Sequence, residues 1–479
     1  MPELIVISAY LAIILGIGVL SYRKTKQADD FFIAGRKGSA PFITGSLLAT
    51  IVGSSATLGM AGLGYSRGLT GSWWLLAGTI GLLFLGMFFA KKVRRFGLYT
   101  LPELIEKQYD RRVSIAASIL IVIAWIAIIA AQINATGAIM GILGIGNVTL
   151  WKLVFTVIII IYTITGGQYA IIRTDALQAI IIFGGIFAGL GIVLSRVGGW
   201  EGLQDMLSPG MFAFPTGPQF GGGDLAAMLL VIGLTYVVGP DMYSRIFCAR
   251  DDRTARLATF SAAGLLVPVA LAVTVIGMGA AALFPGISSE TALPTVIKEL
   301  FSPLVAGVIL AALLCAVMSS ADTTLLSAGT ILTVDIIGRF RSSLEQKRTL
   351  PQSRLIIALL GMCALVVALA FNGIIQAMIF AYTVYTCGVI LPVIAGFFKE
   401  QLKVTGTGAL AALAGGGALG IVSKLVNVRY LDLGALAMSA VLLLLVSFID
   451  TRLRSRRPGT PVQPNTASKL SENNAADKH

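Results

Sequence analysis

The apolar segment 311–335 carries hydroxyl and carboxyl side chains whose spacing places them along one face of a helix. At about 100° per residue, the members of this face are Ala316, Ser319, Ser320, Thr323 and Ser327, with Asp322 on its flank. Hydroxyl, carbonyl and carboxylate oxygens are hard ligands that suit a small hard cation such as Na⁺ better than a soft metal. An aspartate within an apolar helix is costly, so it usually marks an ion pathway or a paired internal charge. The group therefore predicts a cation-binding helix, although the hydroxyls alone would also fit close helix packing.

Composition is typical of a helical membrane protein with many spans. Of the 479 residues, 56% are hydrophobic and only 12% are charged, and the mean hydropathy is +0.87. Apolar runs long enough to cross a bilayer core of ~30 Å recur throughout, and no polar region is long enough for a second, soluble domain. The net charge of +13 does not indicate nucleic acid as a partner, because the basic residues gather in alternate loops, as membrane topology requires. The single histidine is His479 and the four cysteines form no metal-binding pattern, so an enzyme is not indicated.

The hydropathy pattern predicts about thirteen transmembrane helices within residues 1–450. Their ranges are about 3–22, 41–65, 71–90, 113–143, 149–167, 170–195, 224–247, 256–284, 301–331, 353–371, 374–398, 406–427 and 431–450. The loops rich in Lys and Arg are 23–40, 91–112, 339–354 and a short one that begins at Arg245. These loops are expected in the cytoplasm, with the N-terminus outside and 451–479 as a disordered cytoplasmic tail. We therefore expect a multi-pass protein of the cell membrane, in contact with the lipid bilayer.

Two of these segments contain residues that break a helix in the middle of the membrane. Gly53-Ser54-Ser55 interrupts the segment 41–65, and Gly239-Pro240 interrupts the segment 224–247. Discontinuous helices at matching positions in two halves of a chain are typical of secondary transporters with inverted repeats, which bind substrate near the bilayer midplane. Freed carbonyls at such a break can coordinate a cation, whereas a glycine-rich span can also reflect plain close packing.

Four short motifs occur in order along the chain. They are Asp30-Phe31-Phe32-Ile33-Ala34-Gly35-Arg36, Thr100-Leu101-Pro102-Glu103-Leu104, Thr174-Asp175-Ala176-Leu177-Gln178 and Ala316-Val317-Met318-Ser319-Ser320. In order and spacing they resemble the sodium:solute symporter family, which includes proline, sialic acid and sodium–glucose transporters. The resemblance covers roughly residues 1–450 and implies an all-α membrane protein with a LeuT-like core of five plus five helices. The two inverted repeats are then about 41–195 and 224–398.

The resemblance implies two cation sites. The sodium site typical of the family would take backbone carbonyls from the second and ninth spans and hydroxyls from the ninth, here those of Ala49, Val52, Ala316, Ser319 and Ser320. The second cation that some members bind would use Asp175, Asp322 and Thr323. Asp322 stands where other members have serine or threonine, so the second ion could be Na⁺, H⁺ or absent. Asp175 could instead pair with Arg173 or with other groups nearby.

The resemblance also implies a solute site bounded by the second, fourth, seventh and eleventh spans. Candidate residues there are Ser54, Ser55, Thr57, Gln132, Asn134, Tyr236, Asp241, Tyr382 and Tyr385. Asp241 could attract an amine, or could only pair with Arg245 one helical turn later, and the tyrosines could be ordinary packing. Ser55-Ala56-Thr57 and Ile51 depart from the patterns of the sugar and proline carriers, so the resemblance favours neither of those solutes.

These observations together predict a Na⁺-coupled symporter that imports a small polar organic solute by alternating access, with an amino acid or a small carboxylate favoured. Na⁺ is the expected bound ion, and the expected partners are the solute, the ion and the bilayer. A proton-coupled carrier of the same fold and a solute sensor that does not transport are the alternatives. An ion channel is disfavoured because the chain lacks a repeated carbonyl filter motif and a charged ring.

Overall fold

The computed structural model describes residues 2–22, 28–144, 146–338, 346–371, 373–426 and 428–455. Within these ranges the regular structure is helical, apart from two isolated β-bridges. The α-helices are α1 (Pro2–Tyr22), α2 (Ala28–Ile33), α3 (Ala40–Ile51), α4 (Met60–Arg67), α5 (Trp73–Phe84), α6 (Ala90–Phe96), α7 (Leu101–Gln108), α8 (Arg111–Ile142), α9 (Val148–Val197), α10 (Gly199–Met206), α11 (Gly222–Met228), α12 (Leu234–Val237), α13 (Pro240–Cys248), α14 (Asp252–Leu283), α15 (Ala292–Leu300), α16 (Pro303–Ile331), α18 (Gln346–Ala370), α19 (Ile374–Tyr385), α20 (Leu391–Gly396), α21 (Lys399–Leu402), α22 (Gly406–Leu425) and α23 (Leu431–Ser455). Short 3₁₀ or π-helical turns adjoin them at η1 (Ala34–Arg36), η2 (Ser55–Gly59), η3 (Gly68–Ser72), η4 (Leu85–Phe89), η5 (Pro209–Phe212), η6 (Leu229–Gly233), η7 (Ser289–Thr291), η8 (Leu332–Ile337) and η9 (Thr386–Ile390).

Helices occupy every segment that the hydropathy pattern selects. Ten helices or joined helices within the described ranges are long and apolar enough to cross a membrane, judged by length and composition. One of them, α9, contains two of the predicted segments and bends at Gly167, where φ is +54° and ψ is −163°. A Cβ at that position would lie 2.8 Å from the carbonyl oxygen of Phe31, so both the backbone angle and the close approach require glycine. The number of thirteen spans and the orientation of the termini stay predictions.

The predicted tail 451–479 is helical at its start, because α23 continues to Ser455. Arg452 lies 4.2 Å above the ring of Phe448, and this contact at i, i+4 spacing supports the additional helical turn. The rest of the tail lies outside the described residues. So do 23–27 and 339–345, which belong to two of the predicted basic loops.

Both predicted helix breaks are present. α3 ends at Ile51, and the backbone leaves the helix at Val52, where ψ is +57°, before η2 and α4 resume. α12 ends at Val237, and α13 begins at Pro240, which has no N–H to continue the hydrogen-bond ladder. Each break frees backbone polar groups inside a bundle of apolar helices, so other protein groups or ligands must satisfy them.

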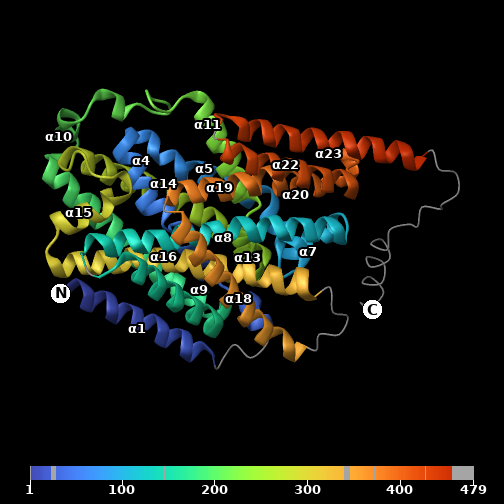
Figure 1. Cartoon of the computed structure of the whole chain (residues 1–479), viewed down its shortest axis with the longest axis horizontal. Helices are drawn as coiled ribbons and strands as arrows, with labels where there is room; N and C mark the ends of the chain where they lie inside the picture. The colour runs from blue at the N-terminus through green and yellow to red at the C-terminus, as the bar shows by residue number, and fades with distance from the viewer. Residues whose placement is uncertain are drawn as a thin grey trace.

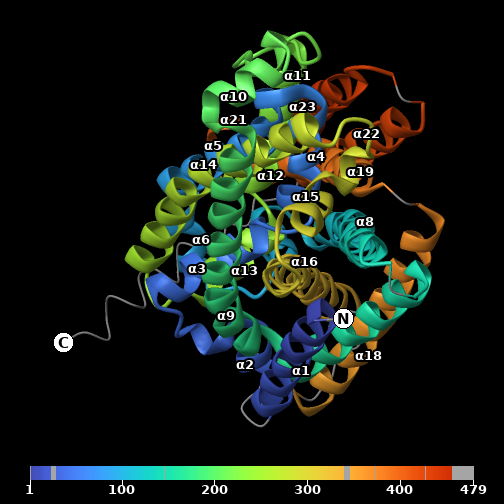
Figure 2. The same cartoon turned by 90° about the vertical axis from the view of Figure 1, so that its left-hand side faces the viewer.

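The helix that carries the predicted cation-binding face, α16, is enclosed by other helices. Every residue from Ile309 to Ile331 is buried, and α1, α8, α9 and α18 pack against the helix. Figure 2, which looks along several helices, shows α16 inside the bundle. α1 and the pair α22–α23 lie on opposite flanks (Figure 1). The polar face of α16 therefore meets protein groups and not lipid.

Candidate cation and solute site

Asp175 of α9 is the centre of a buried polar cluster. Its Oδ2 accepts hydrogen bonds from Ser46 Oγ of α3 at 2.5 Å and from Arg245 Nη2 of α13 at 3.3 Å. Its Oδ1 accepts a hydrogen bond from Ser319 Oγ of α16, also at 2.5 Å. All four side chains are fully buried. One carboxylate thus joins four helices, and two of these, α3 and α13, belong to the broken spans.

Arg245 does not lie in a loop, contrary to the prediction. Its side chain is fully buried, because α13 restarts at Pro240 and directs the residue one turn later into the bundle. The ion pair that Arg245 forms in the described part of the chain is with Asp175, at 3.3 Å, although Arg245 also attracts Asp241 electrostatically. Arg173, the other partner suggested for Asp175, is exposed and stacks on a tyrosine ring of its own helix, 4.3 Å from the ring centroid.

The other donors of Arg245 are also used inside the protein. Nε donates to Ser46 Oγ at 3.1 Å, Nη1 donates to Ser244 Oγ at 3.0 Å, and Nη2 donates to Thr323 Oγ1. A buried guanidinium is tolerated only when it is paired and hydrogen-bonded, as it is here. Because Arg245 contacts both Thr323 and Asp175, a fixed positive charge already touches two of the three residues predicted for a second cation.

The predicted sodium ligands lie where the broken end of α3 faces α16. Ala49 is in the last turn of α3, Val52 follows its end, and Ser320 Oγ of α16 donates to the carbonyl of Thr50 at 2.6 Å. A Cβ on Gly53 would lie 2.1 Å from Ser320 Oγ, so only glycine lets the broken backbone approach α16 this closely. The structure therefore brings oxygens of both elements together and adds the Thr50 carbonyl, which the resemblance did not include.

Asp322, the third residue of the predicted second-cation set, is buried on α16 with a side-chain exposure of 1%. Its Oδ1 accepts a hydrogen bond from Thr323 Oγ1 at 3.3 Å. Its Oδ2 has no hydrogen-bond partner among the residues that the structure describes. An unsatisfied carboxylate oxygen in the interior is costly, so this atom is a candidate position for a cation or a proton.

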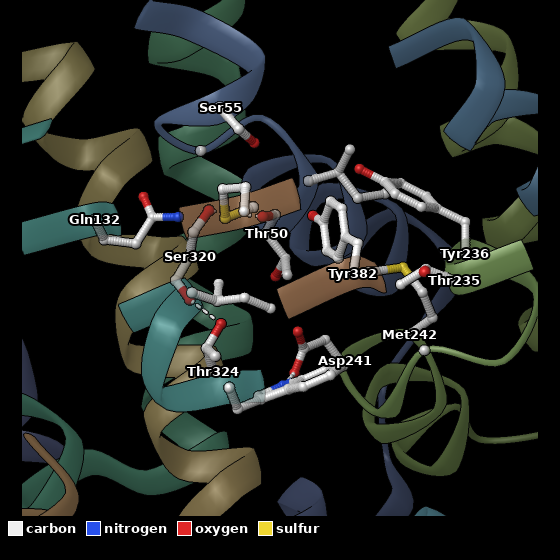
Figure 3. Close-up of a pocket in the computed structure, with 16 residues that line it drawn as sticks. Thr50, Ser55, Gln132, Thr235, Tyr236, Asp241, Met242, Ser320, Thr324 and Tyr382 are labelled. Atoms are coloured by element: carbon white, nitrogen blue, oxygen red, sulfur yellow. Dashed lines mark hydrogen bonds between the residues drawn. The ribbon is translucent and has the colours of Figure 1, made fainter. Parts of the chain in front are cut away.

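A small cavity of about 40 Å³ lies beside the α3–α16 contact (Figure 3). It is lined by Thr50, Ile51, Gly53, Ser55, Trp125, Ile128, Gln132, Thr235, Tyr236, Gly239, Asp241, Met242, Ser320, Thr324, Met378 and Tyr382. The predicted solute residues in this lining are Ser55, Gln132, Tyr236, Asp241 and Tyr382. Both breaks contribute, since residues of the α3 break and the α13 start lie on its walls.

The other predicted solute residues are Ser54, Thr57, Asn134 and Tyr385, and they do not line the cavity. The Thr57 hydroxyl and the Asn134 amide donate to backbone carbonyls at 2.8 and 2.6 Å, and the Tyr385 hydroxyl donates to a carbonyl beside the second break. Ser54 is fully buried and its N–H donates to Gln132 Oε1 at 3.1 Å. Asn134 follows Gln132 by two residues, so the two side chains leave α8 in different directions.

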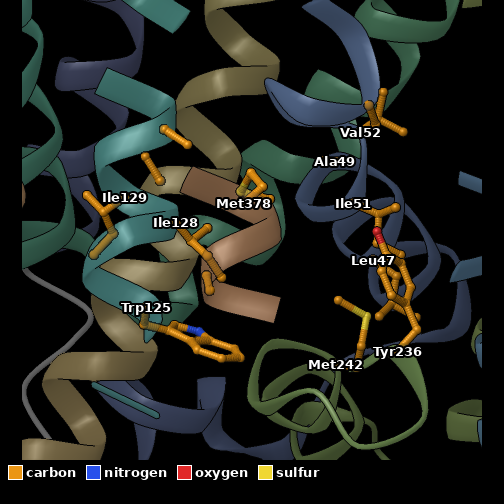
Figure 4. Close-up of a cluster of buried hydrophobic side chains, with 14 of the residues drawn as sticks. Leu47, Ala49, Ile51, Val52, Trp125, Ile128, Ile129, Tyr236, Met242 and Met378 are labelled. Atoms are coloured by element: carbon orange, nitrogen blue, oxygen red, sulfur yellow. The ribbon is translucent and has the colours of Figure 1, made fainter. Parts of the chain in front are cut away.

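Trp125 is a cavity residue that the sequence did not single out. It precedes Gln132 by seven residues, which places both on one face of α8 and is a signal that could have identified it. Its indole Nε1 donates to Asp241 Oδ1 at 2.8 Å. Trp125 also belongs to the apolar cluster around the cavity, together with Met242 and Met378 (Figure 4).

Asp241 is the charged residue of the cavity lining. It lies in the first turn of α13, where the partial positive charge of a helix N-terminus stabilises a carboxylate. The side chain is 8% exposed, and Figure 3 shows the carboxylate pointing into the cavity. Ser244 Oγ donates to the backbone carbonyl of Asp241 at 2.8 Å, which closes this first turn.

Hydrogen bonds link distant segments of the chain at the end of the bundle where α13 finishes. Gly38 N donates to Cys248 O at 2.9 Å, and Arg250 N donates to Gly38 O at 3.0 Å. Arg94 Nε of α6 donates to the carbonyl of Ala249 at 2.5 Å. The start of α3 and the end of α13, which are the two broken spans, are therefore linked at the same end of the bundle.

The known proteins that this chain resembles in sequence are sodium-coupled transporters. The model of the sodium:solute symporter family matches residues 31–416. The sodium/glucose cotransporter of Vibrio parahaemolyticus is 26% identical over 457 residues, which cover 85% of this chain and 82% of that protein. Sodium/glucose cotransporter 4 of Mus musculus is 24% identical over 480 residues, which cover 89% of this chain and 69% of that protein.

Solved structures support the same fold. A Na⁺-coupled sialic acid symporter in a substrate-bound outward-open state superposes with a TM-score of 0.79 at 18% identity, covering 94% of this chain and 98% of the other. A nucleobase-cation-symport-1 family transporter in a closed conformation superposes with a TM-score of 0.58 at 16% identity, covering 88% and 94%. The fold is the all-α, LeuT-like arrangement that the sequence predicts. Because the family model matches most of its length, the chain belongs to the sodium:solute symporter family.

Proposed function

We propose that this protein couples Na⁺ movement to the import of a small polar organic solute, an amino acid or a small carboxylate, by alternating access. Membership of the family supports sodium-coupled solute symport. The observation that carries the proposal is that Ser320 takes part in both the cavity and the proposed sodium site. It lines the cavity, it belongs to the proposed sodium ligands, and its hydroxyl bonds to the Thr50 carbonyl of the broken span. Sodium and solute would thus share one wall of protein.

The proposed sodium ligands are the carbonyls of Ala49, Val52 and Ala316 and the hydroxyls of Ser319 and Ser320. A sodium ion drawn to these oxygens would replace the existing hydrogen bonds as the link between α3 and α16. It would hold the break of α3 in the shape that lines the cavity. The sodium ion and the solute would both require this shape of the α3 break. Binding of either one would therefore favour binding of the other.

Of the three residues predicted for the second cation, we propose that Asp322 is the one that binds it. Arg245 already engages Asp175 and Thr323, whereas Asp322 Oδ2 has no partner in the described part of the chain. Na⁺ and H⁺ are the two candidates for this position, and a proton there corresponds to the proton-coupled alternative. The ion dependence of uptake separates them.

The proposed membrane arrangement follows from the breaks and the charges. We place the two inverted repeats at about 41–195 and 224–398, because each contains one broken helix in its first span. We place the closed end that carries Arg94 and Arg250 in the cytoplasm of a cell whose plasma or inner membrane holds the protein. Each Na⁺ that enters across 100 mV then supplies about 2.3 kcal/mol, roughly a fiftyfold solute accumulation at ideal coupling.

Uptake into proteoliposomes tests the proposal. The full-length protein is given an inward Na⁺ gradient or an equal K⁺ gradient, with a panel of amino acids, short carboxylates, sugars, nucleobases and vitamins. We expect one class of solute to accumulate with Na⁺ and not with K⁺. Uptake driven by a pH gradient and indifferent to Na⁺ would favour the proton-coupled carrier, and binding without uptake would favour a sensor.

A further inference from the structure

We propose that the solute carries a positively charged nitrogen, as a protonated or quaternary amine, and that Asp241 binds this nitrogen within an aromatic wall. The inference rests on the proposed symport function and names the class of solute that the same cavity takes. It selects amine-bearing solutes, amino acids included, over simple carboxylates and sugars.

The charges of the lining carry the first step. Asp241 is the carboxylate among the sixteen residues of the lining, and these residues include no lysine, arginine or histidine. Its Oδ1 accepts the indole N–H of Trp125, and the carboxylate points into the cavity (Figure 3). A solute without positive charge would bury this carboxylate without a direct ion pair, and an anion would place a second negative charge against it. Both arrangements are costly in a dry interior.

Neighbouring charges leave Asp241 without a direct ion pair in the described part of the chain. The described carboxylate and cationic side chains that line the cavity or join its hydrogen-bond cluster are Asp175, Asp241, Asp322 and Arg245. Arg245 forms its ion pair with Asp175 at 3.3 Å. A sodium ion between α3 and α16 would lie on the helix that carries Asp322. Arg245, four residues later on the same helix, attracts the Asp241 carboxylate without forming an ion pair with it, so a cationic group of the solute would be its direct partner.

The apolar part of the lining suits an organic cation. Trp125, Tyr236, Tyr382 and Met242 line the same cavity as Asp241, and the Trp125 indole donates to its carboxylate. Aromatic faces attract ammonium groups within about 6 Å, and this attraction grows when the site excludes water. Such a wall offers few hydrogen bonds to the many hydroxyls of a sugar.

The other polar residues of the lining are neutral. They include Thr50, Ser55, Gln132, Ser320 and Thr324, all of which can donate or accept hydrogen bonds. These groups can hold a carboxylate, hydroxyl or carbonyl oxygen of the solute without a formal charge of their own. The cavity therefore combines one carboxylate, that of Asp241, with neutral hydrogen-bonding groups, several of them at the break of α3.

Matched compounds that differ only at the nitrogen test the inference in full-length protein in proteoliposomes. The pairs are L-alanine and L-lactate, L-proline and tetrahydrofuran-2-carboxylate, and choline and 3,3-dimethylbutan-1-ol. We expect one or more of the nitrogen compounds to accumulate with Na⁺, and their nitrogen-free partners to fail as competitors at a hundredfold excess. Accumulation of no nitrogen compound, or equal competition by its nitrogen-free partner, would overturn the inference.

Two variants at one position supply the second measurement. Asp241→Asn keeps an oxygen for the Trp125 N–H and removes the charge, so we expect KM for the accumulated amine to rise about tenfold to a hundredfold. Asp241→Glu keeps the charge and should restore part of the affinity. An unchanged KM in Asp241→Asn would overturn the inference. Amine uptake that is equal in Na⁺ and K⁺ but lost in Asp241→Asn would support the solute class and contradict sodium coupling.

Discussion

Replacing Arg245 by methionine should destabilise the protein strongly, because it leaves a buried carboxylate without its counter-charge. Both side chains of the Arg245–Asp175 pair are fully buried, and the two atoms nearest each other are 3.3 Å apart. Removing one partner of such a pair costs about 3–5 kcal/mol, most of it the cost of the unpaired charge that remains. Arg245→Met should therefore lower Tm of the full-length protein in detergent well below the wild-type value.

Two comparisons isolate the charge pair from a general packing loss. Arg173→Met removes an exposed arginine that stacks on a tyrosine of its own helix, so it should cost about 1 kcal/mol or less. The double variant Arg245→Met/Asp175→Asn removes both charges and should be more stable than Arg245→Met alone. All variants are measured by tryptophan fluorescence at a single scan rate, since unfolding of a large membrane protein is governed by rate.

Sodium gives a further readout on the same variant. The vacated carboxylate should accept a cation, so Na⁺ should raise Tm of Arg245→Met more than that of wild type. A free ion concentration one hundred times its Kd would return about 2.7 kcal/mol. The reasoning would be refuted if Arg245→Met were no less stable than Arg173→Met, or if removing the Asp175 charge as well brought no recovery.

Two further predictions concern the contact of α16 with the broken span. Ser319→Ala and Ser320→Ala should each weaken the apparent affinity for Na⁺ in uptake about tenfold and leave membrane insertion intact. Thr330→Val is the matched control, because that hydroxyl donates to a carbonyl of its own helix at 2.7 Å. Wild-type Na⁺ affinity in both serine variants would contradict the proposed sodium site. Gly53→Ala should abolish uptake, since its Cβ would lie 2.1 Å from Ser320 Oγ. Gly184→Ala is the control and should be tolerated, because a Cβ there would have nothing within 4 Å. Uptake by Gly53→Ala protein would show that the close approach of the two helices is dispensable.

Part of the site was predictable because it depends on local pattern. A helical period puts Ser319 and Ser320 on one face, and the structure turns that face into the bundle. Gly53 and Pro240 mark the breaks because glycine and proline act on their own backbone, whatever surrounds them. The apolar runs have the length of a bilayer core, which predicts a helical membrane protein before any contact is known.

The long side chains were less predictable because their partners come from other parts of the chain. Arg245 was assigned to a basic loop by charge alone, yet the direction of α13 after its break carries it to Asp175 of α9. Asn134 resembles a solute ligand in sequence, but its side chain bonds to a carbonyl more than two hundred residues away. Trp125 meets Asp241 only when α8 and α13 are packed together.

The sequence alone determined that this chain forms apolar helices, where two of them break, and which face of α16 carries hydroxyl and carboxyl groups. These properties follow from hydrophobic length, helical period and the backbone chemistry of glycine and proline, all of which act over a few residues. Only the tertiary structure decided which charge neutralises Asp175, which groups surround Asp241, and that Ser320 lies between the proposed sodium site and the cavity. Those relations depend on how separate helices pack, since a buried charge is stable only beside the partner that packing brings to it.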